Sequence, residues 1–306
     1  MILDCDPGHD DALAMVLALA RPEVRLLGVT TVAGNATLEN TTRNALAVLT
    51  LIGRSDVPVA AGSAAPLVRP LATAPHVHGK SGLEGAELPQ PAADPLGEHA
   101  VEFMARSIAD SREPVTLVAT GPLSNIALFR AHHPALFERV AHICLMGGAV
   151  GEGNITASAE FNIWVDPEAA AQVFEAGRRL TMIGLDVTHQ AIVTLDDAER
   201  MAQLGNRTGR VFADLLRYFA RFHVERYGWS GAPVHDAVAV AHVLGLGLVE
   251  TKPYRVDVET VSELTRGRTV VDVHGVAGRP ANAQVGLAID RQRFVDVLLE
   301  ALARFG

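Results

Sequence analysis

Short apolar runs alternate along the first 185 residues with segments whose apolar positions recur every three or four residues. The short runs predict buried strands, and the longer periodic segments predict helices. Regular strand–helix alternation favours a mostly parallel sheet with helices on both faces, so we expect an open α/β fold. The expected strands are 2–5, 24–32, 57–62, 115–120, 142–148 and 179–184, and the expected helices are 9–20, 37–53 and 166–177.

After residue 194 the pattern becomes mainly helical and then β-rich. No internal repeat, low-complexity tract or linker interrupts the chain, so we expect a single domain over residues 1–306. The expected helices here are 194–204, 207–227, 235–246 and a last one from Asp290 to the end, and the β-rich stretches are 254–260 and 268–275.

The segment 62–95 is rich in proline and glycine and has no periodicity. Loops of this length inside a compact fold are uncommon and are usually functional or mobile. We therefore expect this segment to form a flap beside the functional site.

Composition excludes several classes of protein. The net charge is −9 and no basic run is present, which argues against a nucleic-acid groove. Cys5 and Cys144 both lie in apolar runs, so we interpret them as core residues rather than as a disulfide or a metal motif. No run has the length of a membrane span and the N-terminus does not resemble a signal peptide, so we expect a soluble, cytoplasmic protein.

Polar or unusual residues follow four of the predicted strands. Ligands of open α/β sheets bind outside the carboxyl ends of the strands. We therefore expect residues from four separate strands to converge at one edge of the sheet. These residues are Asp6, Asn35, Thr120 and Met146.

The stretch ILDCDPGHDDA places four carboxylates within eight residues: Asp4, Asp6, Asp10 and Asp11. Helix capping explains Asp10 and Asp11, which would favour the positive end of the following helix. Capping does not explain Asp4 and Asp6. Several converging carboxylates suit a hard cation such as calcium, although the spacing of an EF-hand is absent.

Two further stretches carry candidate chemistry. His235 and Asp236 open a predicted helix, where they form either a simple cap or a further carboxylate with an acid–base histidine beside it. The segment 151–165 carries Asn154, Glu160 and Asn162. It is either a solvated connection or a source of hydrogen bonds to sugar hydroxyls, with Glu160 and Asn162 on one side of an extended backbone.

The motifs DCDPGHDDA, TTVAGN, HGKSGL, TGPLSNIA, LMGGA, EFNIWVDPEAA and HDA together resemble the nucleoside hydrolases of the inosine–uridine-preferring type, in the family's order over nearly the whole chain. The resemblance implies a Rossmann-like fold with one calcium ion (Ca²⁺) per site. It implies hydrolysis of the N-glycosidic bond of ribonucleosides to ribose and free base. The partner would be a small-molecule ribonucleoside, and the chain would form a homo-oligomer, a dimer or a tetramer.

The resemblance also implies roles for individual residues. Asp6, Asp11 and Asp236 match the calcium carboxylates, with Thr120 giving a backbone carbonyl. Asp6 also matches the general base and His235 the residue that protonates the leaving base. The positions that match ribose contacts are Asp10, Asn35, Asn154, Glu160 and Asn162, with Met146 lining the sugar pocket and His78, from the flap, near the base. Asp4 has no role in this set, and we expect it to make a structural hydrogen bond.

The resemblance also implies that the helix before the HDA motif helps to select the base. His223 and Tyr227 lie four residues apart, so they share one helix face. They either pack in the core or contact the base. A tyrosine here together with His235 resembles pyrimidine-preferring members, whereas relatives often carry another polar residue at the position of His223. The expected substrates are therefore uridine and cytidine, or a broader inosine–uridine set.

Two other functions compete with this interpretation. The D-x-D motif after the first strand is also the nucleophile motif of haloacid-dehalogenase-type phosphatases, but Pro7 and Gly8 follow it where that motif needs Thr or Val. A non-catalytic ribonucleoside-binding protein would keep the sugar residues and lose the base or the acid. Both Asp6 and His235 are present, which disfavours that alternative.

Overall fold

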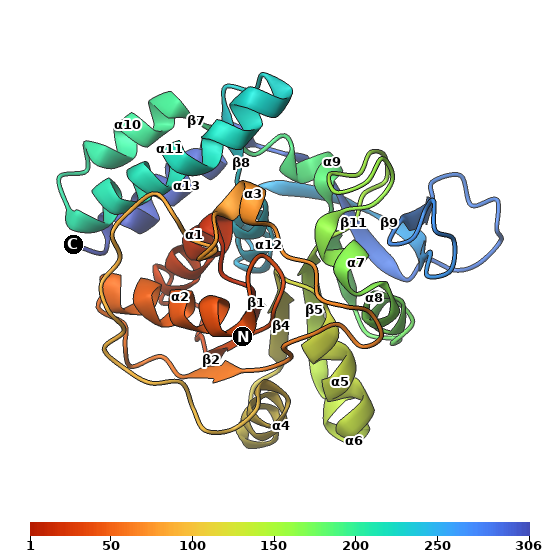
Figure 1. The fold of residues 1–306 in the computed structure, drawn as a ribbon. Coiled ribbons are helices and arrows are strands. Elements are labelled where there is room, and N and C mark those ends of the chain that lie inside the picture. Colours follow the sequence, from red (N-terminus) through yellow and green to blue (C-terminus); the bar gives the residue numbers. More distant parts are fainter.

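A twisted nine-stranded sheet crosses the middle of the molecule, and a separate two-stranded sheet lies among the later helices (Figure 1). The computed structural model describes residues 1–306. The strands are β1 Ile2–Cys5, β2 Gly28–Thr31, β3 Val59–Ala61, β4 Val115–Ala119, β5 Val140–Met146, β6 Leu180–Ile183, β7 Ile192–Thr194, β8 Gly231–Pro233, β9 Val249–Val258, β10 Thr269–Asp272 and β11 Ala283–Ile289.

The order of the large sheet is β10-β9-β11-β6-β5-β4-β1-β2-β3. All neighbours from β3 to β11 pair in parallel, whereas β9 is antiparallel to both β10 and β11. The prediction of a mostly parallel sheet is confirmed. The strand order reverses between β1 and β4, and such a switch point leaves a crevice for ligands at the carboxyl ends of the strands.

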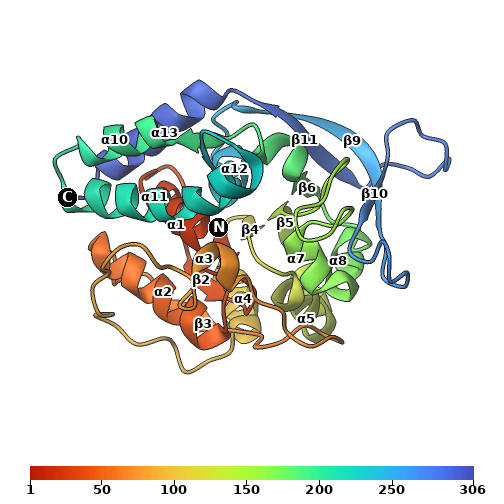
Figure 2. The same ribbon diagram turned by 45° about the horizontal axis from the view of Figure 1, so that its top comes forward.

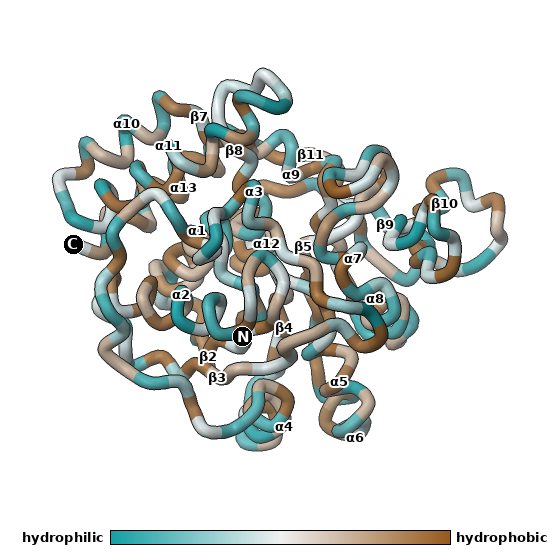
Figure 3. The backbone as a smooth tube through the Cα atoms, viewed as in Figure 1, coloured by the Kyte–Doolittle hydropathy of each residue, from teal (hydrophilic) through white to brown (hydrophobic).

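Helices cover both faces of the sheet and create two hydrophobic cores (Figure 2). Alternate side chains of β1 point to opposite faces, so Ile2 enters one core while Leu3 and Cys5 enter the other. In Figure 3 the outer helices alternate between hydrophilic and hydrophobic turns, as helices with one face on a core do. The helices are α1 His9–Leu19, α2 Leu38–Leu51, α3 Pro75–His78, α4 Ala100–Asp110, α5 Ser124–His132, α6 Pro134–Phe137, α7 Phe161–Val165, α8 Pro167–Phe174, α9 Leu185–Thr188, α10 Leu195–Ala202, α11 Arg207–Tyr227, α12 His235–Val243 and α13 Arg291–Ala303.

The structure differs from the expected elements at several places. The strand expected over 24–32 is only β2, because its partner β1 offers four residues for pairing. Strand β11 and helix α4 were not expected. The sequence of β11 contains Gly286 and does not alternate cleanly, and its pairing with β9 is irregular there.

The expectation that the two cysteines are core residues is confirmed. Cys5 and Cys144 are buried free thiols. None of the helices combines the length and hydrophobicity that a membrane-crossing segment requires.

Candidate active site

The first two residues to converge are those that end β1 and β4, on the two sides of the switch point. Thr120 donates its backbone N–H to the carbonyl of Asp4, 2.8 Å away, which extends the strand pairing. Asp6 comes two residues after Asp4, directly beyond the end of β1. The sequence-predicted site therefore lies where the topology leaves a crevice, with α3, α7 and α12 grouped around it (Figures 1 and 2).

Asp4 is structural, as expected. Its Oδ1 accepts hydrogen bonds from Thr30 Oγ1 at 2.6 Å and from Asn125 Nδ2 at 2.8 Å. Burial raises the pKa of Asp4 to about 7, against the lowering effect of these two hydrogen bonds. This carboxyl thus links β1, β2 and α5 beneath the site.

Four other carboxyl groups are buried together: Asp6, Asp10, Asp11 and Asp236. Oxygens of Asp10, Asp11 and Asp236 lie within 4.8 Å of one another. Burial, followed by repulsion from Asp11, raises the pKa of Asp6 well above its ordinary range and that of Asp10 to about 7. Burial and repulsion from Asp10 likewise raise the pKa of Asp236.

The carboxylates have no cationic side chain to balance them, because neither arginine nor lysine lines the pocket. Asp6 Oδ2 accepts the backbone N–H of Asn35 at 2.6 Å, whereas its Oδ1 is buried without any hydrogen-bond partner. An unsatisfied buried oxygen next to three further carboxylates is costly in the protein alone. The residues present therefore fit a bound cation.

Asp11 combines the two roles that the sequence left open. Its Oδ2 accepts the N–H of Gly8, the N-cap of α1, at 3.0 Å, as the third residue of a capping box does, while its Oδ1 accepts the hydroxyl of Thr120 at 2.7 Å. The carbonyl of Thr120 accepts an N–H of Asn162 and keeps a second lone pair. The capping contact therefore holds the Asp11 carboxylate in the crevice, and capping and a role in the site are compatible.

The backbone around Glu160 and Asn162 is not extended, so that prediction was wrong. Glu160 caps the short helix α7, and its carboxylate accepts the N–H groups of Asn162 and Ile163. It also accepts the N–H of Gly148 at 3.0 Å. Asn162 then lies in the first turn and donates to the carbonyls of Thr120 and Met146. Because the Glu160 side chain caps α7, the residues after it are helical and not extended. The same cap orients the side chains of Glu160 and Asn162.

The opposite end of the pocket is aromatic and comes mainly from α11 and the turn after it. His223 lies with its ring centroid 6.3 Å from that of Tyr227, so the two share a face as predicted. Trp229 stacks on both, at 4.8 Å from Tyr227 and 5.8 Å from His223. Burial lowers the pKa of His223 to about 4, so its ring is neutral near pH 7.

His235 lies between the two ends of the pocket. Its Nδ1 is 2.7 Å from the hydroxyl of Thr188, and its ring is 5.8 Å from that of His189. Burial, then the nearby His189 and His223, lower the pKa of His235 well below its ordinary value. The free protein therefore holds a neutral ring here, and the protonated His235 that the leaving-group role suggested is not its resting state.

The empty space of the pocket, about 740 Å³ with the part that is open to solvent, is lined by residues from separate parts of the chain. Helix α3 and the turn before it bring the segment 62–95 to its rim, as expected for a flap beside the site. Asp6 and Asp11 lie behind the lining. The other predicted residues all line the pocket: Asp10, Asn35, His78, Thr120, Met146, Asn154, Glu160, Asn162, His223, Tyr227, His235 and Asp236.

Sequence reasoning missed part of the lining. His189, Phe219, Phe222 and Trp229 also line the pocket. Helical spacing from His223 could have identified Phe219, four residues earlier. His189 gave no signal, because none of the motifs in the sequence includes it. It directly follows the short helix α9.

Carboxylate and amide oxygens at one end and an aromatic wall at the other suit a ligand with hydroxyls on one side and a flat heterocycle on the other. The fold and the site thus define an α/β protein that binds nucleoside-like molecules. The family model for the inosine-uridine preferring nucleoside hydrolases matches residues 1–296, and the chain belongs to that family of N-glycosyl hydrolases.

Curated relatives match over the full chain. The pyrimidine-specific ribonucleoside hydrolase RihA of Shewanella sp. strain ANA-3 is 52% identical over 99% of this chain and 96% of that protein. The RihA protein of Escherichia coli O127:H6 is 49% identical over 99% of this chain and 97% of that protein. Membership of a hydrolase family, together with the geometry, disfavours both the phosphatase and the non-catalytic alternatives.

Solved structures share the fold. The purine-preferring ribonucleoside hydrolase from Gardnerella vaginalis superposes with a TM-score of 0.92 at 33% identity, over 99% of this chain and 97% of that one. The plant nucleoside hydrolase PpNRh1 gives a TM-score of 0.92 at 30% identity, over 99% and 98%. The Gardnerella enzyme is named as purine-preferring and the RihA proteins as pyrimidine-specific, so base preference needs a separate argument.

Proposed function

We propose that the chain is a calcium-dependent hydrolase of pyrimidine ribonucleosides, uridine and cytidine. The observation that carries the proposal is the set of four buried carboxylates without a cationic side chain, facing an aromatic wall across one pocket. The names of the RihA relatives at about half identity support the pyrimidine preference. The family match over residues 1–296 also supports one hydrolase domain.

Asp6, Asp11 and Asp236 would hold the calcium ion, with the carbonyl of Thr120. Hard cations prefer such oxygen ligands. The unpartnered Oδ1 of Asp6 supports this set, and so does the proximity of Asp11 and Asp236. When bound, calcium would position the attacking water and the ribose hydroxyls by charge and coordination.

Asp6 is the proposed base. As the general base, Asp6 takes a proton from the attacking water while the water oxygen bonds to C1′. The C1′–N bond breaks, and its electrons leave with the nucleobase. Glu160 and Asn162 lie on the sugar side, where negative and amide oxygens stabilise the positive charge that develops on the ribose. Direct attack by water predicts inversion at C1′.

His235 is proposed to act on the leaving base. If the Thr188 hydroxyl donates to Nδ1, the neutral ring carries its hydrogen on Nε2 and can donate it to the base as negative charge develops. His78, His223 and Tyr227 would contact the base from the aromatic side, and Asp10, Asn35 and Asn154 the ribose.

A turnover panel tests the proposal. Purified protein with added calcium is incubated with uridine, cytidine, inosine, adenosine and guanosine, and free ribose is measured. We expect the highest kcat/KM with uridine and cytidine. Faster turnover of inosine or guanosine would overturn the pyrimidine preference, and ribose release from none of the five would overturn the hydrolase.

A further inference from the structure

His9 lies behind the pocket and contacts His78, which lines it. The Nδ1 atoms of the two rings are 3.0 Å apart. The Nε2 of His9 lies 2.7 Å from the backbone carbonyl oxygen of Glu84. The His9 ring stacks nearly parallel to Tyr218 and Phe219, with centroids 5.5 and 5.1 Å away. Both nitrogens and the plane of the His9 ring are therefore fixed.

These contacts determine where the hydrogens lie. A carbonyl oxygen only accepts, so Nε2 of His9 carries a hydrogen and, in the neutral ring, Nδ1 is a lone pair. The shared hydrogen between the rings must then belong to Nδ1 of His78. The amide of His9 also points at that atom, but at 3.5 Å it is outside the normal hydrogen-bond range.

The turn before His9 makes this contact possible. A Cβ atom on Gly8 would lie 2.7 Å from Nδ1 of His78, so a larger residue would displace the ring. The remaining nitrogen of His78, Nε2, has no hydrogen-bond partner in the protein and is not enclosed by it. Since His78 lines the pocket, this nitrogen is available to a ligand.

We propose that His9 is a positioning residue that holds His78 as its Nδ1–H tautomer and thereby presents Nε2 to the substrate as a hydrogen-bond acceptor. The matching ligand chemistry is a donor: an N–H of the base or a hydroxyl of the ribose. The inference rests on the proposed function in one respect, that a ribonucleoside occupies the pocket. The tautomer itself depends only on the protein.

Nitrogen NMR of the full chain labelled with [¹⁵N]histidine tests the tautomer without substrate. His78→Gln assigns the His78 signals. We expect a protonated Nδ1 and an unprotonated Nε2 for His78. His9→Phe keeps the stack but removes both ring nitrogens, and we expect His78 to become a mixture of tautomers in it.

Tyr218→Phe is the matched control. It removes the hydroxyl that donates to the Glu84 carboxylate from the same stack, and Tyr218 does not line the pocket. The His78 signals should be unchanged in this variant. A protonated Nε2 of His78 in the wild type, or the same spectrum in His9→Phe, would overturn the proposal. The wild-type spectrum decides alone if His9→Phe does not fold.

Substrate analogues identify the donor. The protein is assayed with uridine, with 3-methyluridine, which lacks the N3–H, and with 5′-deoxyuridine, which lacks one ribose hydroxyl. The analogue that lacks the donor should lose about tenfold in kcat/KM in the wild type, as expected for one hydrogen bond. In His9→Phe, the ratio of kcat/KM for uridine to kcat/KM for that analogue should approach one.

Equal ratios in the wild type and His9→Phe for both analogues would contradict the acceptor role. If the wild type hydrolyses no nucleoside at all, the proposed function fails, whereas the NMR result remains readable. The two failures are therefore distinguishable.

Discussion

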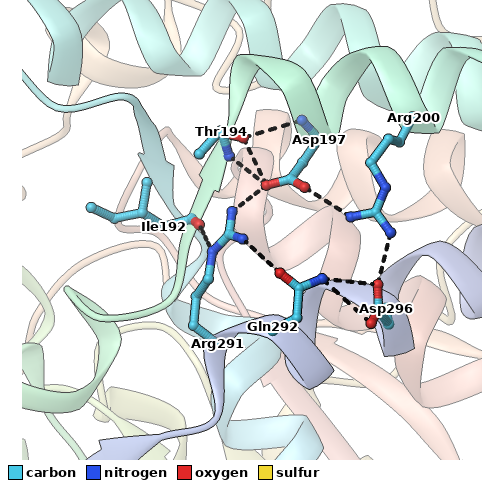
Figure 4. A network of polar contacts seen from close by, with 7 residues as sticks. All are labelled: Ile192, Thr194, Asp197, Arg200, Arg291, Gln292 and Asp296. Atoms are coloured by element: carbon cyan, nitrogen blue, oxygen red, sulfur yellow. Dashed lines mark hydrogen bonds and ion pairs between the residues drawn. The ribbon is translucent and has the colours of Figure 1, made fainter.

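Asp6 and Asp197 are both buried aspartates, but the first is surrounded by carboxylates and the second by arginines. Asp197 belongs to the capping box of α10, whose N-cap is Thr194. Its carboxylate accepts from Thr194, and it pairs with Arg200 at 3.0 Å and with Arg291 from α13 (Figure 4). Arg200 extends the network to Asp296 at 2.8 Å. Each charge in this network has an opposite charge beside it.

The pKa values of the two aspartates move in opposite directions. Burial and the Asp11 charge raise the pKa of Asp6. Partial burial also acts to raise the pKa of Asp197, but hydrogen bonds from Thr194 and the charges of Arg291 and Arg200 outweigh it and lower the pKa. A complete network stabilises the fold, whereas an incomplete one marks the place where a ligand must supply the missing charge.

Asp6→Asn should have the largest effect. We expect a loss of about 10³-fold or more in kcat, because the proposed base is removed. The metal-free protein should not become less stable, since a repelling buried carboxylate is lost with it. Ribose release and thermal unfolding measure the two effects. Turnover within twofold of the wild type would contradict the proposed mechanism.

Removal of the cation should come next. Chelation should abolish activity and lower the melting temperature, and added calcium should restore both, because binding to the folded state alone stabilises it. In Asp236→Asn, with one proposed ligand lost, the shift of melting temperature by calcium should shrink. If metal analysis shows the protein to be metal-free and it still has full activity, the calcium site is excluded.

Asp197→Asn should act on stability alone. It removes the charge of a buried aspartate that pairs with two partly exposed arginines and accepts hydrogen bonds from Thr194. We therefore expect a loss of about 2 kcal/mol in the free energy of unfolding, with kcat/KM within twofold of the wild type. Denaturant titration and the uridine assay measure these quantities. Asp296→Asn is the exposed control in the same network and should cost much less, because ion pairs of exposed groups contribute little to stability. Equal losses in the two variants would remove the distinction.

The smallest effect is the pH dependence of stability. The pKa of Asp10 is about 7 in the folded protein against 3.8 unfolded, so between these values the folded state binds more protons. In metal-free protein, the stability of the wild type relative to Asp10→Asn should therefore fall as pH rises from 4 to 7.

The lowered pKa of Asp197 predicts the opposite sign. The wild type should lose stability relative to Asp197→Asn as pH falls below about 4, because the unfolded chain binds the proton there before the folded carboxylate does. Denaturant titrations across this range, paired with each variant, cancel the contributions of the buried histidines. If the stability of the wild type relative to the variant changed with pH in the same direction for both aspartates, their surroundings would not differ as described.

The sequence alone determined much of this protein. Periodicity predicted the parallel sheet, and the residues at strand ends predicted one site, because parallel strands bring their carboxyl ends to a single edge. The helix spacing of His223 and Tyr227 correctly placed both on one face. Local rules sufficed wherever a contact follows from position on an element.

Only the tertiary structure decided how those residues meet. His9 and His78 are 69 positions apart, and Asp11 and Thr120 are 109 apart. No local pattern shows that Gly8 leaves room for a ring, that Glu160 caps a helix, or that Trp229 stacks on Tyr227. Such contacts arise when separate elements pack around the switch point. The same packing leaves the four aspartates without the arginines that balance Asp197.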